Sequence, residues 1–198
     1  REQKLTALRE VLKKEGADYL LTSKLDDIAW IFNLRGSDVP DNPVFYAYSL
    51  IPAKGNATLF INEEKVPADL KEQLAEEGVV LAPYHSVGAA LASLSSGTVL
   101  ADPEEINASL LSRLPEQITQ LELPNPIELM KALKTPEEIE LISEAMLKDG
   151  VALVRFFAWL DRNLGKEEMT EQSLADKLLY FRKSLPGYIS LSFETISA

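Results

Sequence analysis

The sequence predicts a layered α/β fold in which about six short strands are interleaved with helices. Short apolar runs typical of strands recur along roughly the first two thirds of the chain, and stretches with helical spacing separate them. The pattern changes at Leu-Pro-Asn-Pro, residues 123–126, where two prolines restrict the residues before them. We therefore expect one domain over residues 1–123 and the beginning of a second over residues 124–198.

The chain is expected to open with an amphipathic helix. Leu5, Leu8 and Leu12 recur at helical spacing among Lys, Arg and Glu, and Gly16 follows as a natural C-terminal stop. A short strand over residues 17–22 is predicted to follow this helix.

A helix, a long connection and a hairpin come next. Ser23 is expected to cap a helix over residues 24–32. After the connection at residues 33–45, strands are predicted over residues 44–53 and 57–61. A Lys-Gly-Asn turn separates these strands, so they are expected to pair as a hairpin.

Helices and strands then alternate up to the proline-rich segment. Helices are predicted near residues 67–77, 86–94 and 107–113, and strands at residues 79–82, 98–101 and 118–123. This alternation indicates helices packed on a sheet.

The second part is predicted to begin with a long helix. Thr135 as N-cap, Pro136 at the first helical position and Glu138 in a capping box mark its start. The helix is expected to run to about Asn163 and to end at Gly165. It carries an apolar stripe formed by Ile139, Ile142, Met146, Leu153, Phe157 and Leu160.

A further helix is predicted over residues 170–184. The Pro-Gly pair after it turns the chain into an apolar run that predicts a strand over residues 188–193. Two helices and one strand do not complete a domain, and Arg1 is not an initiator methionine. The chain is therefore expected to be an excised fragment.

Composition limits the kind of protein. With 198 residues, 46% of them hydrophobic and 26% charged, the chain is expected to bury a core as an ordinary globular protein. Its net charge of −11 disfavours nucleic acid and anionic membranes as partners, because clustered Lys and Arg bind both. No stretch approaches the roughly 20 apolar residues that span a bilayer. The lack of cysteine excludes disulfides, thiolate zinc sites and a Cys nucleophile, and it fits a reducing compartment.

The usual signatures of catalysis are missing from the sequence. The one histidine, His85, lies beside a turn and is predicted to be a surface residue without a role. No Gly-x-Ser-x-Gly motif occurs, and Ser-Ser-Gly at residues 95–97 lacks a phosphate-loop lysine. The acidic runs at residues 102–105 and 137–140 are expected to be solvated helix starts rather than metal ligands.

Asp149 is a carboxylate in an unexpected place. It lies on the apolar stripe of the long helix between Met146 and Leu153, so it is expected to be buried and to need partners. Two interpretations stay open. One is a structural hydrogen-bond hub, with Gly150 allowing close packing, and the other is a direct catalytic role.

Residues 33–45, here termed the elbow, form a charged and proline-rich connection. In one interpretation Arg35 pairs with Asp38 or Asp41 within a stiff surface loop. In the other, the prolines hold a guanidinium and carboxylates ready for a ligand that carries a carboxylate or an amine. The residues alone leave both interpretations open.

Several strings resemble the large, three-domain Xaa-Pro aminopeptidases (aminopeptidase P) of the creatinase/prolidase superfamily. Similar to the middle domain of that family are LDDIAW at residues 25–30, NLRGSD at 33–38 and NPVF at 42–45. Similar to the opening of its catalytic domain are DGVALVRF at residues 149–156, with Trp159 and Leu160, and GYISLSFETI at 187–196. The strings follow the family order and cover essentially the whole chain.

The resemblance implies a creatinase N-terminal-like, ribonuclease-H-like mixed sheet, followed by the first helices of an incomplete pita-bread catalytic domain. It also implies a cytoplasmic, homodimeric parent enzyme that removes an N-terminal residue from proline-containing peptides when proline is second. The family holds two divalent metal ions, commonly manganese, with two Asp, one His and two Glu. These ligands would lie after residue 196, so the fragment itself is expected to bind no metal and to be inactive.

The resemblance also suggests that the elbow walls a substrate cleft, its own or that of a partner subunit. Arg35 is then expected to bind an anion or a backbone carbonyl, Asp38 to accept an amine, and Asn42 to fix the loop or face the substrate. These roles follow from loop position and side-chain chemistry.

Other classes of function stay open. The chain could be a purely interacting, scaffolding domain that uses the elbow for a subunit contact. A prolidase-type or creatinase-type relative would share the fold without sharing the substrate. An acidic-site nuclease on a ribonuclease-H-like sheet is a third hypothesis, which the negative charge and the lack of a basic patch disfavour.

Overall fold

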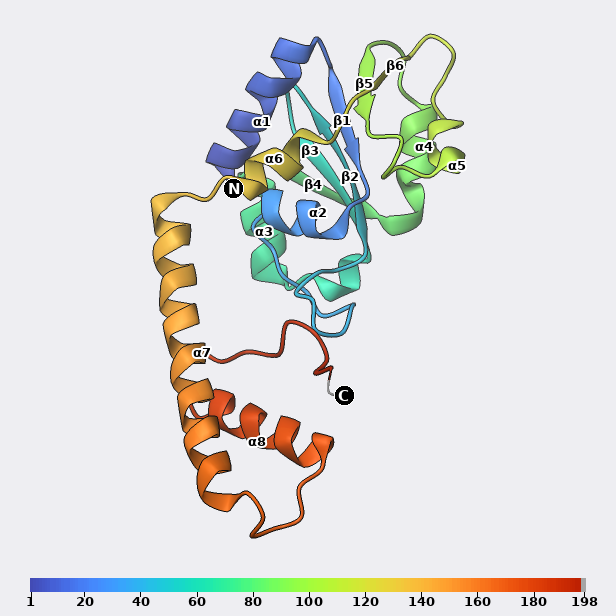
Figure 1. Cartoon of the computed structure of the whole chain (residues 1–198). Helices are drawn as coiled ribbons and strands as arrows, with labels where there is room; N and C mark the ends of the chain where they lie inside the picture. The colour runs from blue at the N-terminus through green and yellow to red at the C-terminus, as the bar shows by residue number, and fades with distance from the viewer. Residues whose placement is uncertain (197–198) are drawn as a thin grey trace. The chain divides into compact units, whose positions relative to one another are not determined.

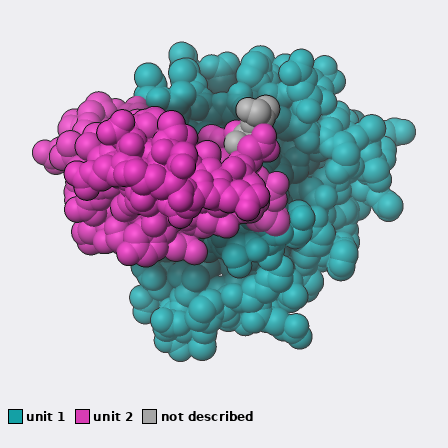
Figure 2. Space-filling view, turned by 60° about the horizontal axis from the view of Figure 1, so that its bottom comes forward, with its two compact units in different colours: residues 1–39, 43–133 teal, residues 40–42, 134–198 magenta. Residues whose placement is uncertain are grey.

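The computed structural model describes residues 1–196 and divides the chain into two compact units. Unit 1 comprises residues 1–39 and 43–133, and unit 2 comprises residues 40–42 and 134–198, as coloured in Figure 2. Within the described part, no helix combines the length and the apolar character needed to cross a membrane.

A six-stranded mixed sheet forms the centre of unit 1, in the order β4-β3-β2-β1-β5-β6 (Figure 1). The strands are β1 (Tyr19–Thr22), β2 (Ala47–Pro52), β3 (Ala57–Ile61), β4 (Val79–Pro83), β5 (Thr98–Ala101) and β6 (Thr119–Glu122). β2 runs antiparallel to its neighbours β1 and β3, and the other neighbouring pairs are parallel. The predicted α/β fold and the β2–β3 hairpin are confirmed.

Helices cover both faces of this sheet (Figure 1). One face carries α1 (Glu2–Glu15), α2 (Leu25–Ile31), α3 (Ala68–Glu76) and α6 (Pro126–Ala132), and the other carries α4 (Val87–Ala92) and α5 (Ala108–Leu111). Successive strand residues point to opposite faces, so Leu20 packs in the first core and Leu21 in the second. The central strands β1, β2, β3 and β5 are mostly buried, as expected for strands covered on both faces, whereas the edge strand β6 is mostly exposed.

The first helix follows its sequence signals. Leu5, Leu8 and Leu12 are all buried against the sheet. Gly16 ends α1 in the left-handed conformation, with φ 72°, and its N–H donates to the last turn.

The start of α2 differs from the prediction. Ser23 does not cap this helix, because Lys24 occupies the N-cap position and makes no side-chain cap bond. The Ser23 hydroxyl instead donates to the Glu105 carbonyl over 2.8 Å. Ser23 therefore ties the end of β1 to the segment after β5.

Helix α6 was not predicted from the sequence. Asn125 is its N-cap and Pro126 its first residue, so the proline-rich segment that was interpreted as a break also starts a helix. Ile127 is fully buried in the core of unit 1. The compact units consequently divide after Leu133, and the proposed domain limit at residues 123/124 stays a prediction.

Unit 2 contains two helices, α7 (Pro136–Asn163) and α8 (Glu171–Lys183). The capping box of Thr135 and Glu138 is present, and α7 ends at the predicted residue. The strand expected over residues 188–193 is wrong, because these residues form no strand. An apolar run alone cannot form a strand without a neighbouring strand to pair with.

The prediction that Asp149 is buried is also wrong. Its side chain is 37% exposed and accepts two hydrogen bonds from the Arg182 guanidinium, at 2.6 and 3.3 Å. A Cβ at Gly150 would meet nothing within 4 Å, so no close packing requires that glycine. Asp149 therefore joins α7 to α8 by an ion pair.

Candidate functional site

The candidate site lies at the edge of the sheet where most strands end. All strands except β2 run in one direction, so their carboxyl ends lie beside the start of β2. The strand order reverses between β1 and β5, because the chain first builds β2 to β4 on one side and then β5 and β6 on the other. Open α/β sheets bind ligands at this kind of edge. The elbow leads directly into β2 and so reaches the same edge.

Backbone hydrogen bonds hold the two arms of the elbow together. The Gly36 N–H donates to the Pro43 carbonyl over 3.3 Å, and the Asp38 N–H donates to the Val44 carbonyl over 3.1 Å. Val44 and Phe45 are buried and anchor the second arm in unit 1. A Cβ at Gly36 would lie 2.7 Å from the Phe45 Cβ, so a larger residue requires one of them to move.

Asp38 fastens the elbow to the neighbouring segments. Its Oδ1 accepts a hydrogen bond from the Lys65 Nζ at 2.6 Å, and its Oδ2 accepts one from the Tyr46 N–H at 2.9 Å. Lys65 ends the short 3₁₀ helix η1 (Glu63–Lys65), and Tyr46 precedes β2. The Lys65 hydrogen bond, followed by that of the Tyr46 N–H, lowers the pKa of the Asp38 carboxyl.

The other two predicted site residues are placed differently. Arg35 is exposed, and within residues 1–196 it forms an ion pair with neither Asp38 nor Asp41. The Asn42 Nδ2 donates to the Pro40 carbonyl over 3.1 Å, which fixes the local turn. Both oxygens of Asp38 already accept hydrogen bonds inside the protein. The cleft roles of Arg35, Asp38 and Asn42 stay predictions.

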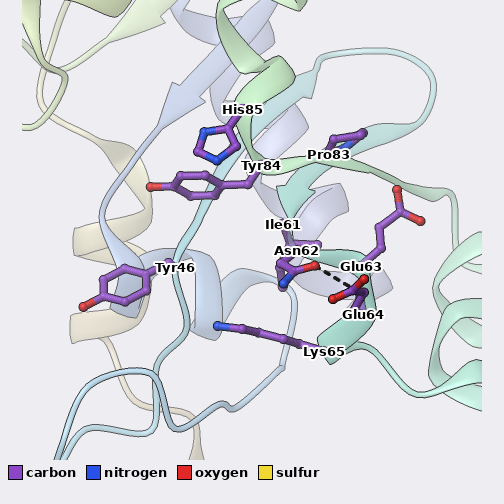
Figure 3. Close-up of a pocket in the computed structure, with 9 residues that line it drawn as sticks. All are labelled: Tyr46, Ile61, Asn62, Glu63, Glu64, Lys65, Pro83, Tyr84 and His85. Atoms are coloured by element: carbon purple, nitrogen blue, oxygen red, sulfur yellow. Dashed lines mark hydrogen bonds between the residues drawn. The ribbon is translucent and has the colours of Figure 1, made fainter.

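An open pocket of 790 Å³ lies beside the elbow (Figure 3). Its lining comes from Tyr46, from the end of β3 with η1, and from Tyr84 and His85 in the 3₁₀ helix η2 (Tyr84–Ser86) after β4. Asp38 bonds to two of the lining residues, Tyr46 and Lys65. The elbow therefore helps to shape this pocket, here termed the aromatic pocket.

Two aromatic contacts order the pocket wall. The Tyr84 ring lies against Tyr48, with the ring centroids 5.1 Å apart, and His85 meets Tyr84 edge-on with the centroids 5.2 Å apart. Burial, followed by interaction with the Tyr48 phenol, raises the pKa of Tyr84 to about 12. Tyr84 thus stays neutral at physiological pH, with its hydroxyl beside the Tyr48 phenol. As expected, His85 is a surface residue.

A buried polar network occupies the point where the strand order reverses. Asp27 and Thr22 are 0% exposed and Asn125 is 3% exposed. The Asn125 Nδ2 lies 2.9 Å from Asp27 Oδ2, 3.0 Å from Glu105 Oε2 and 3.2 Å from Thr22 Oγ1. Its Oδ1 accepts from the Ile127 N–H at 3.1 Å. One amide thus joins β1, α2 and the segment after β5 to the start of α6.

Two lysines balance the charge of this network. The Lys131 ammonium bonds to Asp27 Oδ1 at 2.5 Å and also pairs with Asp26. Lys24 pairs with Glu105 and Glu128. Burial raises the pKa of Asp27, and the hydrogen bond and charge of Lys131 offset this only in part.

The described residues, 1–196, do not fit a dinuclear metal centre. Among residues 1–196, one group could meet a single ion: Asp27, Glu105 and Glu128, whose ligand atoms lie within 4.8 Å of one another. Lys24, Lys131 and the Asn125 amide already occupy these carboxylates. The group includes no histidine, and a second group for a second ion is missing from the described residues. The network of Asn125 with Thr22, Asp27 and Glu105 is therefore explained as a structural element that holds the start of α6 on the sheet, and it is termed the latch.

Sequence reasoning missed the aromatic pocket and the latch. Tyr46 and Tyr48 are spaced two residues apart, which places both side chains on one side of an extended chain. Tyr84 and His85 directly follow a strand. These signals were present, but the pairing of β3 with β4 that brings them together depends on the folded sheet.

Comparisons with known proteins agree on one family. The model of the creatinase/prolidase N-terminal domain matches residues 1–138. Over 99% of this chain, the sequence is 36% identical to a probable Xaa-Pro aminopeptidase P of Sordaria macrospora and 37% identical to Xaa-Pro aminopeptidase 1 of Dictyostelium discoideum. These matches cover 34% and 32% of the two proteins, so the chain spans about a third of the length of the curated relatives that it matches.

The crystal structure of the X-prolyl aminopeptidase from Caenorhabditis elegans has the same fold. It superposes on the whole of this chain with a TM-score of 0.90 and 31% sequence identity, and the match covers 33% of the worm protein. That protein is described as a cytosolic enzyme with a di-nuclear active site. The expected creatinase N-terminal-like fold is confirmed.

Proposed function

Because the chain belongs to the creatinase/prolidase N-terminal domain family, we propose that it is part of an Xaa-Pro aminopeptidase. Such an enzyme releases the N-terminal residue of peptides that have proline in second position. The observation that carries this proposal is the superposition of the whole chain on the C. elegans enzyme with a TM-score of 0.90. The identity of 36–37% to two further Xaa-Pro aminopeptidases over 99% of the chain supports it.

In this proposal residues 1–123 form the domain that precedes the catalytic domain in the sequence, and residues 124–198 begin the catalytic domain. The carboxylates in the described part of the chain do not fit a dinuclear centre, so in this proposal the two divalent ions, manganese, are held by other residues of the whole protein. The chain alone is accordingly expected to be inactive. The whole protein is proposed to be a cytoplasmic homodimer that acts on proline-containing peptides.

The elbow is proposed to form part of the wall of the substrate cleft. Gly36 and Asp38 fix its backbone, while the Arg35 side chain is exposed and makes no ion pair with the elbow carboxylates. An exposed guanidinium on a fixed loop can bind a substrate carboxylate or carbonyl at little entropic cost. Arg35 is thus the proposed contact, Asp38 holds the loop, and Asn42 fixes the turn.

The test uses the whole protein that contains this chain. Arg35→Ala is expected to raise KM for an Xaa-Pro peptide about tenfold or more, because a charge-assisted hydrogen bond to the substrate is lost. The matched control is Lys54→Ala, which removes an exposed cation from the hairpin turn at the opposite edge of the sheet. Hydrolysis rates and the molar mass in solution are measured together.

Three outcomes separate the hypotheses. A raised KM with an unchanged molar mass supports the cleft wall. A changed molar mass with unchanged kinetics of the remaining assembly supports a scaffolding role for the elbow. If the wild-type whole protein cleaves Xaa-Pro dipeptides but fails to cleave Xaa-Pro peptides of greater length, it is a prolidase-type relative, and the aminopeptidase proposal is wrong.

A further inference from the structure

The aromatic pocket presents ring surfaces that the protein itself does not cover. Tyr46 is 52% exposed, and His85 is also exposed at the rim. The volume of 790 Å³ lies within the range of about 300–1,000 Å³ that is usual for ligand sites. Large exposed aromatic surfaces beside polar groups are typical of binding sites.

The pocket is also fixed before any ligand arrives. Asp38 holds the Tyr46 backbone at 2.9 Å and the Lys65 ammonium at 2.6 Å. Tyr84 is held between Tyr48 and His85. Since the Lys65 ammonium and the Tyr84 ring already have partners in the protein, a ligand loses little affinity to their immobilisation.

The polar groups of the pocket are arranged in two sets. Figure 3 shows the phenol rings of Tyr46 and Tyr84 on one side, and Glu63 and Glu64 in η1 on the other. The Tyr46 phenol offers a hydroxyl donor, and both rings offer flat apolar faces. The Glu63 and Glu64 carboxylates form no salt bridge with any residue in the described part of the chain. They therefore leave negative charge at the rim.

We propose that the aromatic pocket docks a proline-rich peptide segment in the polyproline II conformation, with a Lys or Arg next to the prolines. A polyproline II segment has no internal hydrogen bonds, so its carbonyls are free to accept from the Tyr46 hydroxyl. Its proline rings pack flat on aromatic side chains, and its stiffness limits the entropy lost on binding. The basic residue complements Glu63, Glu64 and the net charge of −11.

The charge pattern favours this occupant over a nucleotide or nucleic acid. A nucleobase could stack on the tyrosines, but its phosphates would approach Glu63 and Glu64. Lys65, the cation of the pocket, is already paired with Asp38. A basic peptide meets no such repulsion.

The experiment measures binding of a fluorescent peptide to the 198-residue chain by anisotropy. The peptide is an N-acetylated run of prolines followed by two arginines, so it has no free N-terminus to be trimmed by an aminopeptidase. Saturable binding is expected, and Tyr46→Ala and Tyr84→Ala should each weaken it by about tenfold or more. Tyr180→Ala, which removes an exposed tyrosine of α8 outside the pocket, should leave it unchanged.

The charge part of the proposal has its own controls. Replacing the peptide arginines with glutamates, or introducing Glu63→Gln together with Glu64→Gln, should weaken binding several-fold and reduce its salt dependence. If Tyr84→Ala does not fold, as circular dichroism would show, Tyr46→Ala still tests the pocket because Tyr46 is half exposed.

Two results would overturn the proposal. One is no saturable binding of the arginine peptide, or binding of a single-stranded oligonucleotide in its place. The other is that Tyr46→Ala, like the control Tyr180→Ala, leaves the affinity for the peptide unchanged. Because the acetylated peptide is no aminopeptidase substrate and the chain alone is used, neither result would affect the proposed Xaa-Pro aminopeptidase function.

Discussion

At the scale of single residues, Gly36 decides whether the elbow keeps its shape. Gly36→Ala places a Cβ 2.7 Å from the Phe45 Cβ and 3.0 Å from the Val44 carbonyl oxygen. The elbow has to shift to make room for this Cβ, and the shift is expected to lower the unfolding free energy by about 1–3 kcal/mol. Denaturation in urea measures the change.

Gly150→Ala serves as the matched control. It lies within α7, and its Cβ would meet nothing within 4 Å, so the substitution should stabilise the helix by about 0.5–1 kcal/mol. Opposite signs for the two substitutions are expected. Equal effects would show that the elbow adapts to a side chain at Gly36, and a fixed loop would then no longer be supported.

Asp38 should make stability depend on pH in one direction. Its pKa in the folded state is lowered from the ordinary value of 3.8, mainly by the Lys65 hydrogen bond. A lowered pKa means that the stabilisation is fully present above about pH 4 and is lost as the pH falls through the folded-state pKa. Asp38→Asn should thus cost stability at pH 7 and progressively less below pH 4.

The measurement for Asp38 is urea unfolding of wild type and Asp38→Asn at several pH values. Lys65→Gln should show the same pH dependence, because it removes the partner charge of the same pair. A difference between wild type and Asp38→Asn that stays constant down to the acid limit would contradict the ion pair as its source.

Residues far apart in sequence explain what sequence reasoning could not assign. In one of the two interpretations of the elbow, Arg35 pairs with Asp38 or Asp41, but Asp38 bonds to Lys65, 27 residues away. The pairing of β2 with β3 brings Asp38 and Lys65 together, so no local sequence pattern predicts the contact. Asp149 was expected to be buried because the stripe of α7 was assumed to face a core, and it lies instead at a half-exposed junction with Arg182.

At the scale of elements, the Asn125 latch holds α6 on the sheet. Asn125→Ala removes the N-cap of α6 and leaves buried Asp27 and Thr22 without the amide donor. The loss of the N-cap and the loss of the amide donor to the buried acceptors should together lower the free energy of unfolding by about 2–4 kcal/mol. Thermal and urea unfolding both measure this cost.

Asn107→Ala separates the two contributions. Asn107 caps α5 through one bond to the Leu110 N–H at 3.0 Å, and its side chain is exposed. Its loss should cost only about 1 kcal/mol, the usual value of an N-cap. If the two substitutions destabilise equally, the buried acceptors near Asn125 have found other donors, and the latch is weaker than the distances suggest.

Elements with both an apolar pattern and end signals were predictable. The Gly16 stop of α1, the capping box of α7 and the strands of the sheet all follow from local chemistry. Helix α6 was missed because Pro126 was interpreted as a breaker, although proline is favoured at the first helical position. The strand at residues 188–193 was predicted from its apolar run alone, but strands need a partner that these residues lack here.

At the scale of the whole molecule, the long helix α7 exposes more apolar surface than a helix in water usually does. Met146 is 66% exposed, and Ala152 is the one buried residue of this helix. Exposed apolar patches of this kind mark contact surfaces. This agrees with the proposal that residues 124–198 begin a catalytic domain, whose remaining elements would cover α7.

Met146→Lys is therefore expected to have a small effect on stability in the 198-residue chain and a large one in the whole protein. In the 198-residue chain it should change the unfolding free energy by no more than about 0.5 kcal/mol and reduce binding of a hydrophobic dye. In a whole protein of the relatives' length it should destabilise by about 2 kcal/mol or more, because it buries an unpaired ammonium. Ser143→Lys adds the same side chain to α7 without removing apolar surface, so it should leave dye binding unchanged. Equal tolerance of Met146→Lys in both contexts would mean that nothing covers this face, and the catalytic-domain assignment of residues 124–198 would be wrong.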